Sequence, residues 1–276
     1  MPIAHANDID IYYELHGSGP RLTLIEGLGY HRWMWFKQLP DFAEHFSVLV
    51  YDNRGVGKSD KPPGPYNHAQ NAGDLAGLLD HIGWDSTNLL GVSMGGFIAQ
   101  EFTLKYPERV EKLILVATGF GGPRMVPVPP EAAKAMMPDP SLSPEERIRR
   151  AMPVAFGDRD WPMKHPEEFD QMVAWRLEEP QPPEAAMAQI MAGVSFDVSN
   201  RVREIQAPTL IIAGIRDNVV PPENARLLAS EIPNSRLETL PDAGHLCIIE
   251  ASQRFNASVI EFVESVDVDR VPIEVS

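Results

Sequence analysis

The segment Gly91–Gly96, which reads GVSMGG, constrains the fold of this chain more than any other part of the sequence. It follows a β-rich run over Asn88–Gly91 and precedes a helical pattern that includes Ile98 and Phe102. Small residues on both sides of Ser93 permit a sharp turn from a strand into a helix, and such a turn lifts the serine hydroxyl above the end of the strand. The segment predicts an exposed serine nucleophile or, as the simpler alternative, a glycine-rich turn with a capping serine.

Short β-rich runs alternate with longer helical patterns on both sides of this turn, which is typical of a mostly parallel sheet covered by helices on both faces. The stretch Asn67–Ile82 predicts one such helix, because leucines recur three and four positions apart after a capping asparagine. The short loop Gly17–Gly19 is interpreted as a hairpin turn. Strands are predicted over Ile9–Leu15, Leu22–Glu26, Phe46–Tyr51, Asn88–Gly91, Lys112–Ala117, Thr209–Ala213 and Arg236–Leu240, with later helices near Glu223–Ile232 and up to Ser265.

The interval from Gly119 to Phe196 differs in composition from the rest of the chain. It contains thirteen of the twenty-six prolines and eight of the eleven methionines. Frequent prolines limit a segment to short helices joined by stiff turns, so residues 120–196 are expected to form a helical lid inserted after the sixth strand. Residues 1–119 and 197–276 would form the core, with a polar tail over 266–276. The lid methionines would either adapt to apolar ligands of varied shape or fill gaps in its packing.

The charge balance excludes several classes of partner. Twenty-four basic against thirty-nine acidic side chains give a net charge of −15, which repels nucleic-acid phosphates and anionic membrane surfaces. The longest apolar run, Leu113–Ala117, is far shorter than the ~20 residues that span a bilayer, and residues 1–10 lack an export-signal pattern. The single cysteine, Cys247, cannot form an internal disulfide. We therefore expect a cytoplasmic protein with no metal, no cofactor, no nucleic acid and no membrane partner.

Two later segments supply the groups that a serine nucleophile needs. A serine hydroxyl is weakly nucleophilic at neutral pH and requires a base, and a carboxylate must hold a histidine base in the correct tautomer. Asp217 follows the apolar strand that begins at Thr209, and His245 follows the last predicted strand. Both residues therefore lie beyond the carboxyl ends of strands, as Ser93 does. The sequence predicts that the three side chains meet at one edge of the sheet.

The chain resembles the α/β-hydrolase superfamily over nearly its whole length outside the predicted lid. The resemblance rests on Leu22–Gly29, Tyr51–Ser59, Gly91–Gly96, Gly214–Pro222 and Asp242–His245, and on the chain order Ser, Asp, His. Within the superfamily the chain is most similar to lidded carboxylesterases and lactonases, including the enol-lactonase and acyl-homoserine-lactonase branches. This resemblance implies an α/β-hydrolase fold, with a mostly parallel central sheet flanked by helices, and an enzyme that cleaves carboxylic esters.

The resemblance also assigns roles to individual residues. Ser93 would attack the substrate carbonyl, His245 would transfer the proton, and Asp217 would orient the histidine. The backbone N–H groups of Leu28 and Met94 would hold the oxyanion. Four neighbours of these positions are candidates for substrate binding: Tyr30, His31, Phe120 and Leu246.

Glu26 departs from the pattern of the superfamily, in which many members have histidine before the first glycine of this loop. A carboxylate aimed at the oxyanion would oppose catalysis by charge repulsion, so we expect Glu26 to point away and to be hydrogen-bonded behind the loop. The alternative is a specific supporting role. Trp33 and Trp35 are interpreted as pocket or core residues, and Cys247 as a buried, inert thiol.

The favoured function is that of a serine hydrolase that cleaves a small-molecule ester or lactone through an acyl-enzyme, as a monomer or homodimer. Narrower alternatives are an acyl-homoserine-lactone or enol-lactone hydrolase, and the same triad is used by carbon–carbon bond hydrolases and perhydrolases. A hydrolase-fold ligand sensor with slow turnover is the alternative from another class, and a structural pseudoenzyme is a third. Repeated turnover would distinguish the enzyme from both.

Overall fold

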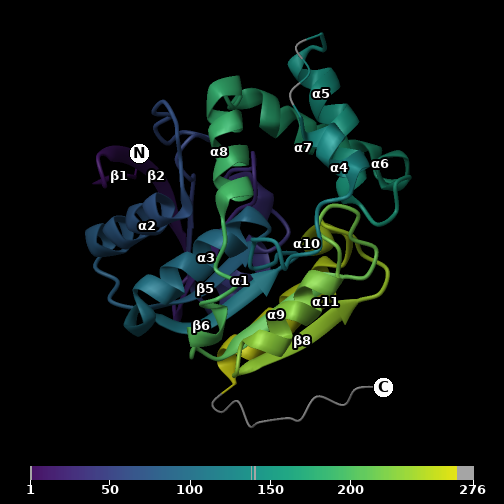
Figure 1. Cartoon of the computed structure of the whole chain (residues 1–276). Helices are drawn as coiled ribbons and strands as arrows, with labels where there is room; N and C mark the ends of the chain where they lie inside the picture. The colour runs from purple at the N-terminus through teal and green to yellow at the C-terminus, as the bar shows by residue number, and fades with distance from the viewer. Residues whose placement is uncertain (1, 138, 140, 266–276) are drawn as a thin grey trace.

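The computed structural model describes residues 2–137, 139 and 141–265, so the expected tail over 266–276 lies outside the described residues. The described residues form one sheet of eight strands (Figure 1). The strands are β1 (Ile3–Ala6), β2 (Ile9–His16), β3 (Arg21–Ile25), β4 (Ser47–Tyr51), β5 (Thr87–Val92), β6 (Val110–Val116), β7 (Thr209–Gly214) and β8 (Ser235–Leu240).

The strand order is β1-β2-β4-β3-β5-β6-β7-β8. Pairing is antiparallel between β1 and β2 and between β2 and β4, and parallel at every later pair. The mostly parallel sheet is therefore confirmed. For each of the seven predicted strands, the predicted first and last residues lie within two positions of the observed ones. The edge strand β1 is missing from the prediction, because four residues are too few to display a clear alternating pattern.

The predicted hairpin at Gly17–Gly19 is wrong. The strand before this loop, β2, pairs with β4, and the strand after it, β3, lies on the other side of β4. Gly17 instead lets the loop pass close to the backbone of α1 (Leu39–His45), since a Cβ on Gly17 would lie 2.2 Å from the carbonyl oxygen of Ala43. Burial explains the placement: β3 is almost entirely buried and takes a central position, whereas β2 is partly exposed and stays near the edge.

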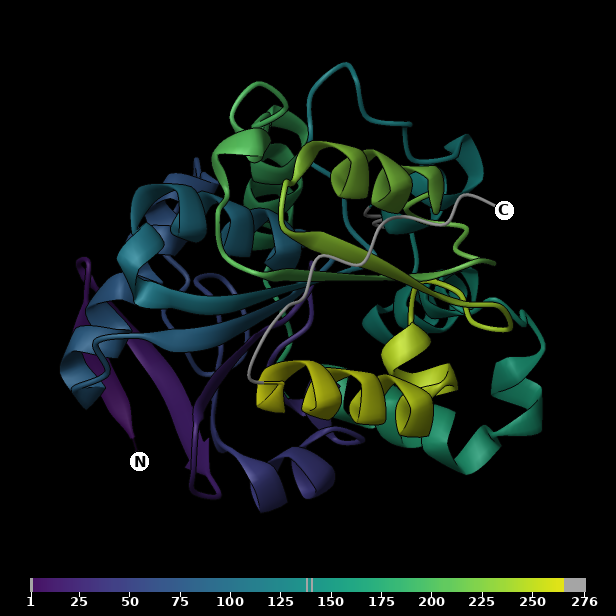
Figure 2. The same ribbon diagram turned by 90° about the horizontal axis from the view of Figure 1, so that it is seen from below.

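Helices cover both faces of the sheet, as predicted (Figure 2). One face carries α1 (Leu39–His45) and α11 (Ser252–Glu264), and the other carries α2 (His68–Ile82), α3 (Met94–Lys105) and α9 (Glu223–Glu231). The predicted cap of α2 is confirmed, because the Asn67 side chain accepts the Gln70 N–H at 2.9 Å while the Gln70 side chain accepts the Asn67 N–H at 3.0 Å.

A helical insertion connects β6 to β7 beside the carboxyl ends of the parallel strands (Figure 1). Its helices all have proline in the first two positions, where a missing N–H leaves no hydrogen bond unmade. Gly121 and Asp197 form an isolated antiparallel bridge where the insertion leaves and rejoins the core. These helices are α4 (Pro130–Met136), α5 (Pro144–Ala151), α6 (Trp161–Lys164), α7 (Pro166–Glu178) and α8 (Pro183–Ser195).

Short helical turns complete the architecture. A last short helix, α10 (Cys247–Glu250), precedes α11, and 3₁₀ turns occupy Arg32–Trp35, Pro107–Arg109, Met152–Ala155 and Val202–Glu204. Within the described residues, none of the helices combines the length and the apolar composition needed to cross a bilayer.

Candidate active site

Ser93 lies between β5 and α3 in a backbone conformation that L-residues rarely adopt, with φ 56° and ψ −117°. Two hydrogen bonds hold the backbone there: the Ser93 N–H donates to the Val116 carbonyl at 2.8 Å, and the Thr118 hydroxyl donates to the Ser93 carbonyl at 2.8 Å. The side chain stays partly exposed. The sharp strand-to-helix turn predicted from the sequence is therefore confirmed.

Glycine is required around Ser93 because backbone segments come very close together. A Cβ on Gly91 would lie 2.2 Å from the carbonyl oxygen of Gly95, and a Cβ on Gly95 would lie 2.2 Å from the carbonyl oxygen of Ile25. Both neighbours are backbone atoms, which cannot rotate away as a side chain can. The first turn of α3 is therefore packed tightly against the ends of β5 and β3, and this packing fixes where the serine side chain projects.

The structure brings His245 and Asp217 into direct contact. Nδ1 of His245 lies 2.9 Å from Oδ2 of Asp217, and both side chains are buried. The other oxygen, Oδ1, accepts the N–H groups of Val219 at 2.7 Å and Val220 at 2.8 Å. The carboxylate can therefore only accept from the ring, which places the hydrogen on Nδ1 and leaves Nε2 as the proton-accepting nitrogen. Within the described residues the Ser93 hydroxyl makes no hydrogen bond to His245.

The loop after β3 passes beside the serine. A Cβ on Gly27 would lie 3.4 Å from the Ser93 Cβ and 3.9 Å from its Oγ. In the described part of the chain, the backbone N–H groups of Leu28 and Met94 donate no hydrogen bond. Two unused donors in the segments that flank a serine hydroxyl are the arrangement that an oxyanion requires.

Glu26 is fully buried and faces away from the serine loop, as expected. Its Oε1 accepts the Asn53 N–H at 2.7 Å, while Oε2 has no partner among the described residues. Burial, with the nearby Asp52 carboxylate, raises the pKa of Glu26 well above its ordinary value of 4.5. The expectation that Glu26 is hydrogen-bonded behind the loop is confirmed.

Replacing Glu26 by glutamine should stabilise the fold at neutral and alkaline pH. The raised pKa means that the folded chain holds this proton more tightly than the unfolded chain, so its stabilising contribution is complete below about pH 4.5 and is lost as the pH rises through the folded-state pKa. Glutamine keeps the oxygen that accepts the Asn53 N–H and never ionises. We expect a Tm several degrees above that of the native chain at about pH 8 and an equal Tm at about pH 4. A gain of the same size at both pH values would contradict this explanation.

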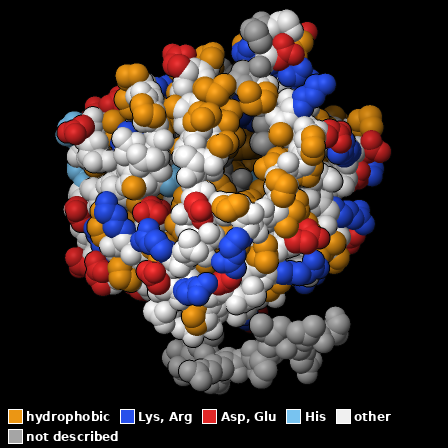
Figure 3. Space-filling view, in the orientation of Figure 1, with side chains coloured by type: hydrophobic (Ala, Val, Ile, Leu, Met, Phe, Trp, Pro, Cys, Tyr) orange, Lys and Arg blue, Asp and Glu red, His pale blue; other side chains and the backbone are white. Residues whose placement is uncertain are grey.

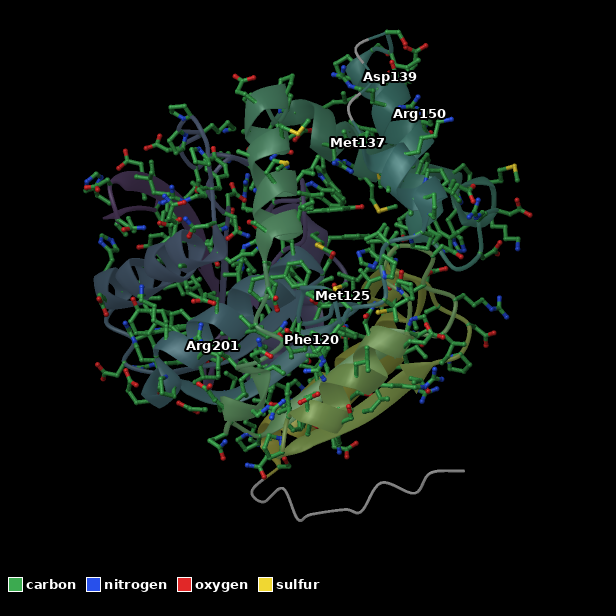
Figure 4. All side chains as sticks on the ribbon, in the orientation of Figure 1. Phe120, Met125, Met137, Asp139, Arg150 and Arg201 are labelled. Carbon is green, nitrogen blue, oxygen red and sulfur yellow. The ribbon has the colours of Figure 1, made fainter. Side chains whose placement is uncertain are left out.

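The four candidate substrate-binding residues occupy different surroundings. Phe120 and Leu246 are buried, Phe120 in the hydrophobic cluster that also contains Met94. The ring of Tyr30 lies 4.8 Å from the guanidinium of Arg176 and packs on Trp33. The ring of His31 packs edge-on against Trp33, and its Nδ1 faces Asp52 and Glu179. Figure 4 shows Phe120 and Met125 near the point where the insertion leaves the core. Their roles in substrate binding remain predictions.

Trp33, Trp35 and Cys247 belong to the core. The two indoles are 8% and 0% exposed and share one hydrophobic cluster. Cys247 is completely buried, and burial raises the pKa of its thiol well above the ordinary range. The thiol is therefore protonated at neutral pH and cannot serve as the nucleophile, as expected.

Glu250 is a site residue that no sequence pattern identified. Its carboxylate accepts three backbone N–H groups, from Gly244 at 2.7 Å and from Gly157 and Asp158 at 3.0 and 3.2 Å. It therefore joins the loop that carries His245 to the insertion. The two loops are in close contact here, since a Cβ on Gly244 would lie 2.2 Å from the Gly157 nitrogen. Only a tertiary fold brings these segments together, so no local signal exists in the sequence.

Replacing Glu250 by glutamine should lower turnover by about tenfold, because an amide has one acceptor where two carboxylate oxygens now serve three donors. An unpaired buried N–H costs about 1–3 kcal/mol, so the histidine loop should loosen. We expect kcat to fall while KM stays nearly constant, since Glu250 acts through the position of His245. Glu261→Gln, on an exposed helix face, provides the control. A change in KM alone would exclude this positioning role.

Comparisons with known proteins agree with this architecture. Residues 20–252 match the family described as the α/β-hydrolase fold. The 2-hydroxy-6-oxononadienedioate/2-hydroxy-6-oxononatrienedioate hydrolase of Burkholderia vietnamiensis is 34% identical over 262 residues, covering 90% of this chain and 85% of the relative. The 3-oxoadipate enol-lactonase 2 of Acinetobacter baylyi is 28% identical over 269 residues, covering 94% and 97% of the two chains.

A solved structure is similar over the same length. The enol-lactonase from Burkholderia xenovorans LB400 has a TM-score of 0.85 at 27% identity, covering 96% of this chain and all of the other. The family match spans most of the chain, and these relatives are a hydrolase and an enol-lactonase by name. The chain therefore belongs to the α/β-hydrolase fold family, and its general activity is hydrolysis.

Proposed function

We propose that this protein is a carboxylic-ester hydrolase that cleaves small esters or lactones through an acyl-enzyme. Ser93 is the nucleophile, His245 the general base and acid, and Asp217 the residue that orients the histidine. The observation that carries the proposal is the contact of 2.9 Å between Oδ2 of Asp217 and Nδ1 of His245. The other carboxylate oxygen, Oδ1, is held by the backbone N–H groups of Val219 and Val220. This arrangement leaves Nε2 of His245 as the acceptor.

Acylation forms one bond and breaks another. The Ser93 oxygen bonds to the substrate carbonyl carbon while its proton moves to Nε2 of His245, and the carbonyl oxygen becomes an oxyanion held by the N–H groups of Leu28 and Met94. The ester C–O bond then breaks, and the departing alkoxide takes the proton from Nε2. In a lactone this alcohol stays attached to the acyl chain, so the ring opens on the enzyme.

Deacylation repeats the same steps with water. Nε2 of His245 accepts a proton from water as the water oxygen bonds to the acyl carbon, and the proton then returns to the Ser93 oxygen as the acid leaves. The products are a carboxylic acid and an alcohol, or one hydroxy acid from a lactone. Each turnover consumes one water molecule and returns Ser93 and His245 to their starting protonation states.

The surroundings of the proposed oxyanion site favour an apolar acyl group of short to medium length. Met94 belongs to a hydrophobic cluster with Phe120 and Phe196, and Leu28 and Met125 pack against this cluster. Figure 3 shows a hollow between α8 and the α4 side of the insertion, and hydrophobic side chains surround it. An apolar wall binds hydrocarbon better than a charged acid. We propose that residues 120–196 act as the lid over this hollow.

A second candidate is carbon–carbon bond hydrolysis, which is favoured by the 34% identity to the 2-hydroxy-6-oxononadienedioate hydrolase. That substrate carries two carboxylates, whereas the cluster around Met94 and Phe120 is apolar. The apolar surroundings therefore favour an ester. The net charge of −15 and the single buried cysteine support a cytoplasmic enzyme that acts on a small molecule.

A substrate panel tests the proposal. We would measure steady-state rates on p-nitrophenyl esters of short, medium and long acyl chains, on homoserine lactones and enol-lactones, and on 2-hydroxy-6-oxononadienedioate. Repeated turnover on esters or lactones with apolar acyl groups is the expected result. Turnover confined to the dienedioate would establish the carbon–carbon reaction instead. A reaction that stops near one turnover per chain would indicate a ligand sensor.

A further inference from the structure

Three ligand-type side chains converge where the insertion meets the core. His31 lies just beyond the loop after β3, Asp52 follows β4, and Glu179 follows α7. Nδ1 of His31 lies 3.5 Å from Oε2 of Glu179 and 3.9 Å from Oδ1 of Asp52. One ligand atom from each residue lies within 4.8 Å of the others. His31 is 5% exposed and Asp52 is completely buried, so this cluster is part of the interior.

The imidazole of His31 turns a lone pair toward the two carboxylates. Nε2 lies 3.4 Å from the Trp175 carbonyl oxygen, which can only accept, so the hydrogen of the neutral ring is on Nε2. Nδ1 is buried and has no hydrogen-bond partner among the described residues. Nitrogen and oxygen lone pairs therefore face one another with no hydrogen between them.

Arg32 binds the same carboxylates, and both oxygens that face His31 already accept a hydrogen bond from it. Oδ1 of Asp52 accepts the backbone N–H of Arg32 at 3.0 Å, and Oε2 of Glu179 accepts from the guanidinium of Arg32. The guanidinium donates to Oδ2 of Asp52 at 2.6 Å, to both oxygens of Glu179 at 2.9 Å, and to Glu14 at 3.0 Å. Nζ of Lys58 lies 3.5 Å from Glu179. Three carboxylates thus surround two cationic side chains and an imidazole ring.

A cavity of about 280 Å³ adjoins the cluster and supplies a route for an ion. Aromatic and charged side chains line it together, and His31 and Glu179 form part of its wall.

We propose that His31, Asp52 and Glu179 bind a divalent transition-metal ion of the zinc type. Imidazole nitrogen and carboxylate oxygen are ligands of such ions at ~2.0–2.2 Å, so two ligands of one ion lie at most ~4.4 Å apart. The observed cluster, with separations of up to 4.8 Å, needs to contract by only a few tenths of an ångström. A metal-binding histidine usually donates its other N–H to a carboxylate or a backbone carbonyl, and Trp175 provides that carbonyl.

A bound ion would hold the insertion in a fixed position relative to the core. Glu179 belongs to the segment after α7, whereas His31 and Asp52 belong to loops of the core. An ion shared by the three would tie the end of α7 to the core near the loop that carries Leu28. The proposal is independent of the ester chemistry, since none of the three residues forms or breaks a bond or transfers a proton in the proposed acylation and deacylation.

Calorimetric titration with ZnCl₂ at about pH 7, after removal of metal by a chelator, tests the site. The native chain should bind one zinc ion per chain, and His31→Gln should lower the affinity for that ion by at least ~10-fold. Loss of even an outer partner of a metal ligand typically costs 10–100-fold in affinity. His45→Gln removes an exposed histidine that pairs with Glu264, and this control should bind one zinc ion as tightly as the native chain. Co²⁺ in place of Zn²⁺ should give a visible absorption spectrum that is lost in His31→Gln.

Glu179→Gln provides a second variant in case His31→Gln folds poorly, which circular dichroism and Tm would reveal. This variant keeps the size of the side chain and should lower the affinity for the same zinc ion. Zinc should also raise the Tm of the native chain and of Ser93→Ala by equal amounts. The proposal is overturned if the native chain takes up no zinc, or if both cluster variants bind it as tightly as the native chain.

Discussion

Ser93→Ala should reduce hydrolysis by roughly 10⁴- to 10⁶-fold while leaving the fold intact, because no other described side chain at the turn can form the acyl-enzyme. The substitution removes only the hydroxyl. The contacts that hold the turn, to the Val116 carbonyl and from the Thr118 hydroxyl, involve the backbone of residue 93 and persist in alanine. Alanine also occupies φ 56° at a similar cost to serine, since both carry a Cβ.

The measurement is kcat on the best ester of the substrate panel, with covalent labelling by a fluorophosphonate as a second readout. The variant should keep the native Tm and lose the label. Ser195→Ala is the matched control, because that hydroxyl donates to the Ala192 carbonyl within its own helix and should leave both readouts unchanged. A Ser93→Ala chain that cleaves esters at a rate near the native one would refute the assignment of the nucleophile.

Local patterns were sufficient to predict the elements that position the candidate site. The strand-to-helix turn at Ser93 needs glycine at positions 91 and 95, because backbone atoms of Gly95 and Ile25 occupy the space that a Cβ would need. The sequence shows this requirement directly as its glycines. Asp217 and His245 were placed by a rule of parallel sheets, in which loops after successive strands gather at one edge. Their contact at 2.9 Å agrees with that rule.

Contacts between distant segments could not be predicted in the same way. Glu250 binds N–H groups of the insertion and of the histidine loop, and nothing next to it in the sequence distinguishes it from a surface glutamate. His31 follows the loop of Leu28 directly, which suggested an apolar pocket residue, yet its neighbours Asp52 and Glu179 arrive from two other parts of the chain. The same limitation explains the error at Gly17–Gly19, where strand order depends on burial of whole strands.

Asp217→Asn should lower kcat by about 10⁴-fold through the tautomer of His245, with little change in KM. Oδ1 of Asp217 accepts two N–H groups, from Val219 at 2.7 Å and Val220 at 2.8 Å, whereas Oδ2 faces Nδ1 of His245. Asparagine has one oxygen, and the two backbone donors will retain it. Its NH₂ group must then face Nδ1, which becomes an acceptor, so the ring hydrogen moves to Nε2. A protonated Nε2 cannot take the proton of Ser93.

The tautomer is a direct readout that a merely structural role would not change. Nitrogen NMR of ¹⁵N-labelled histidine should show the hydrogen of His245 on Nδ1 in the native chain and on Nε2 in Asp217→Asn. Asp242→Asn, which alters an exposed carboxylate paired with Arg216 only three residues from His245, should leave the tautomer and kcat unchanged. Because the amide replaces the carboxylate atom for atom, Tm should fall little. An Asp217→Asn chain with native kcat, or one that loses activity while Nδ1 stays protonated, would show that the carboxylate does not act by orienting the imidazole.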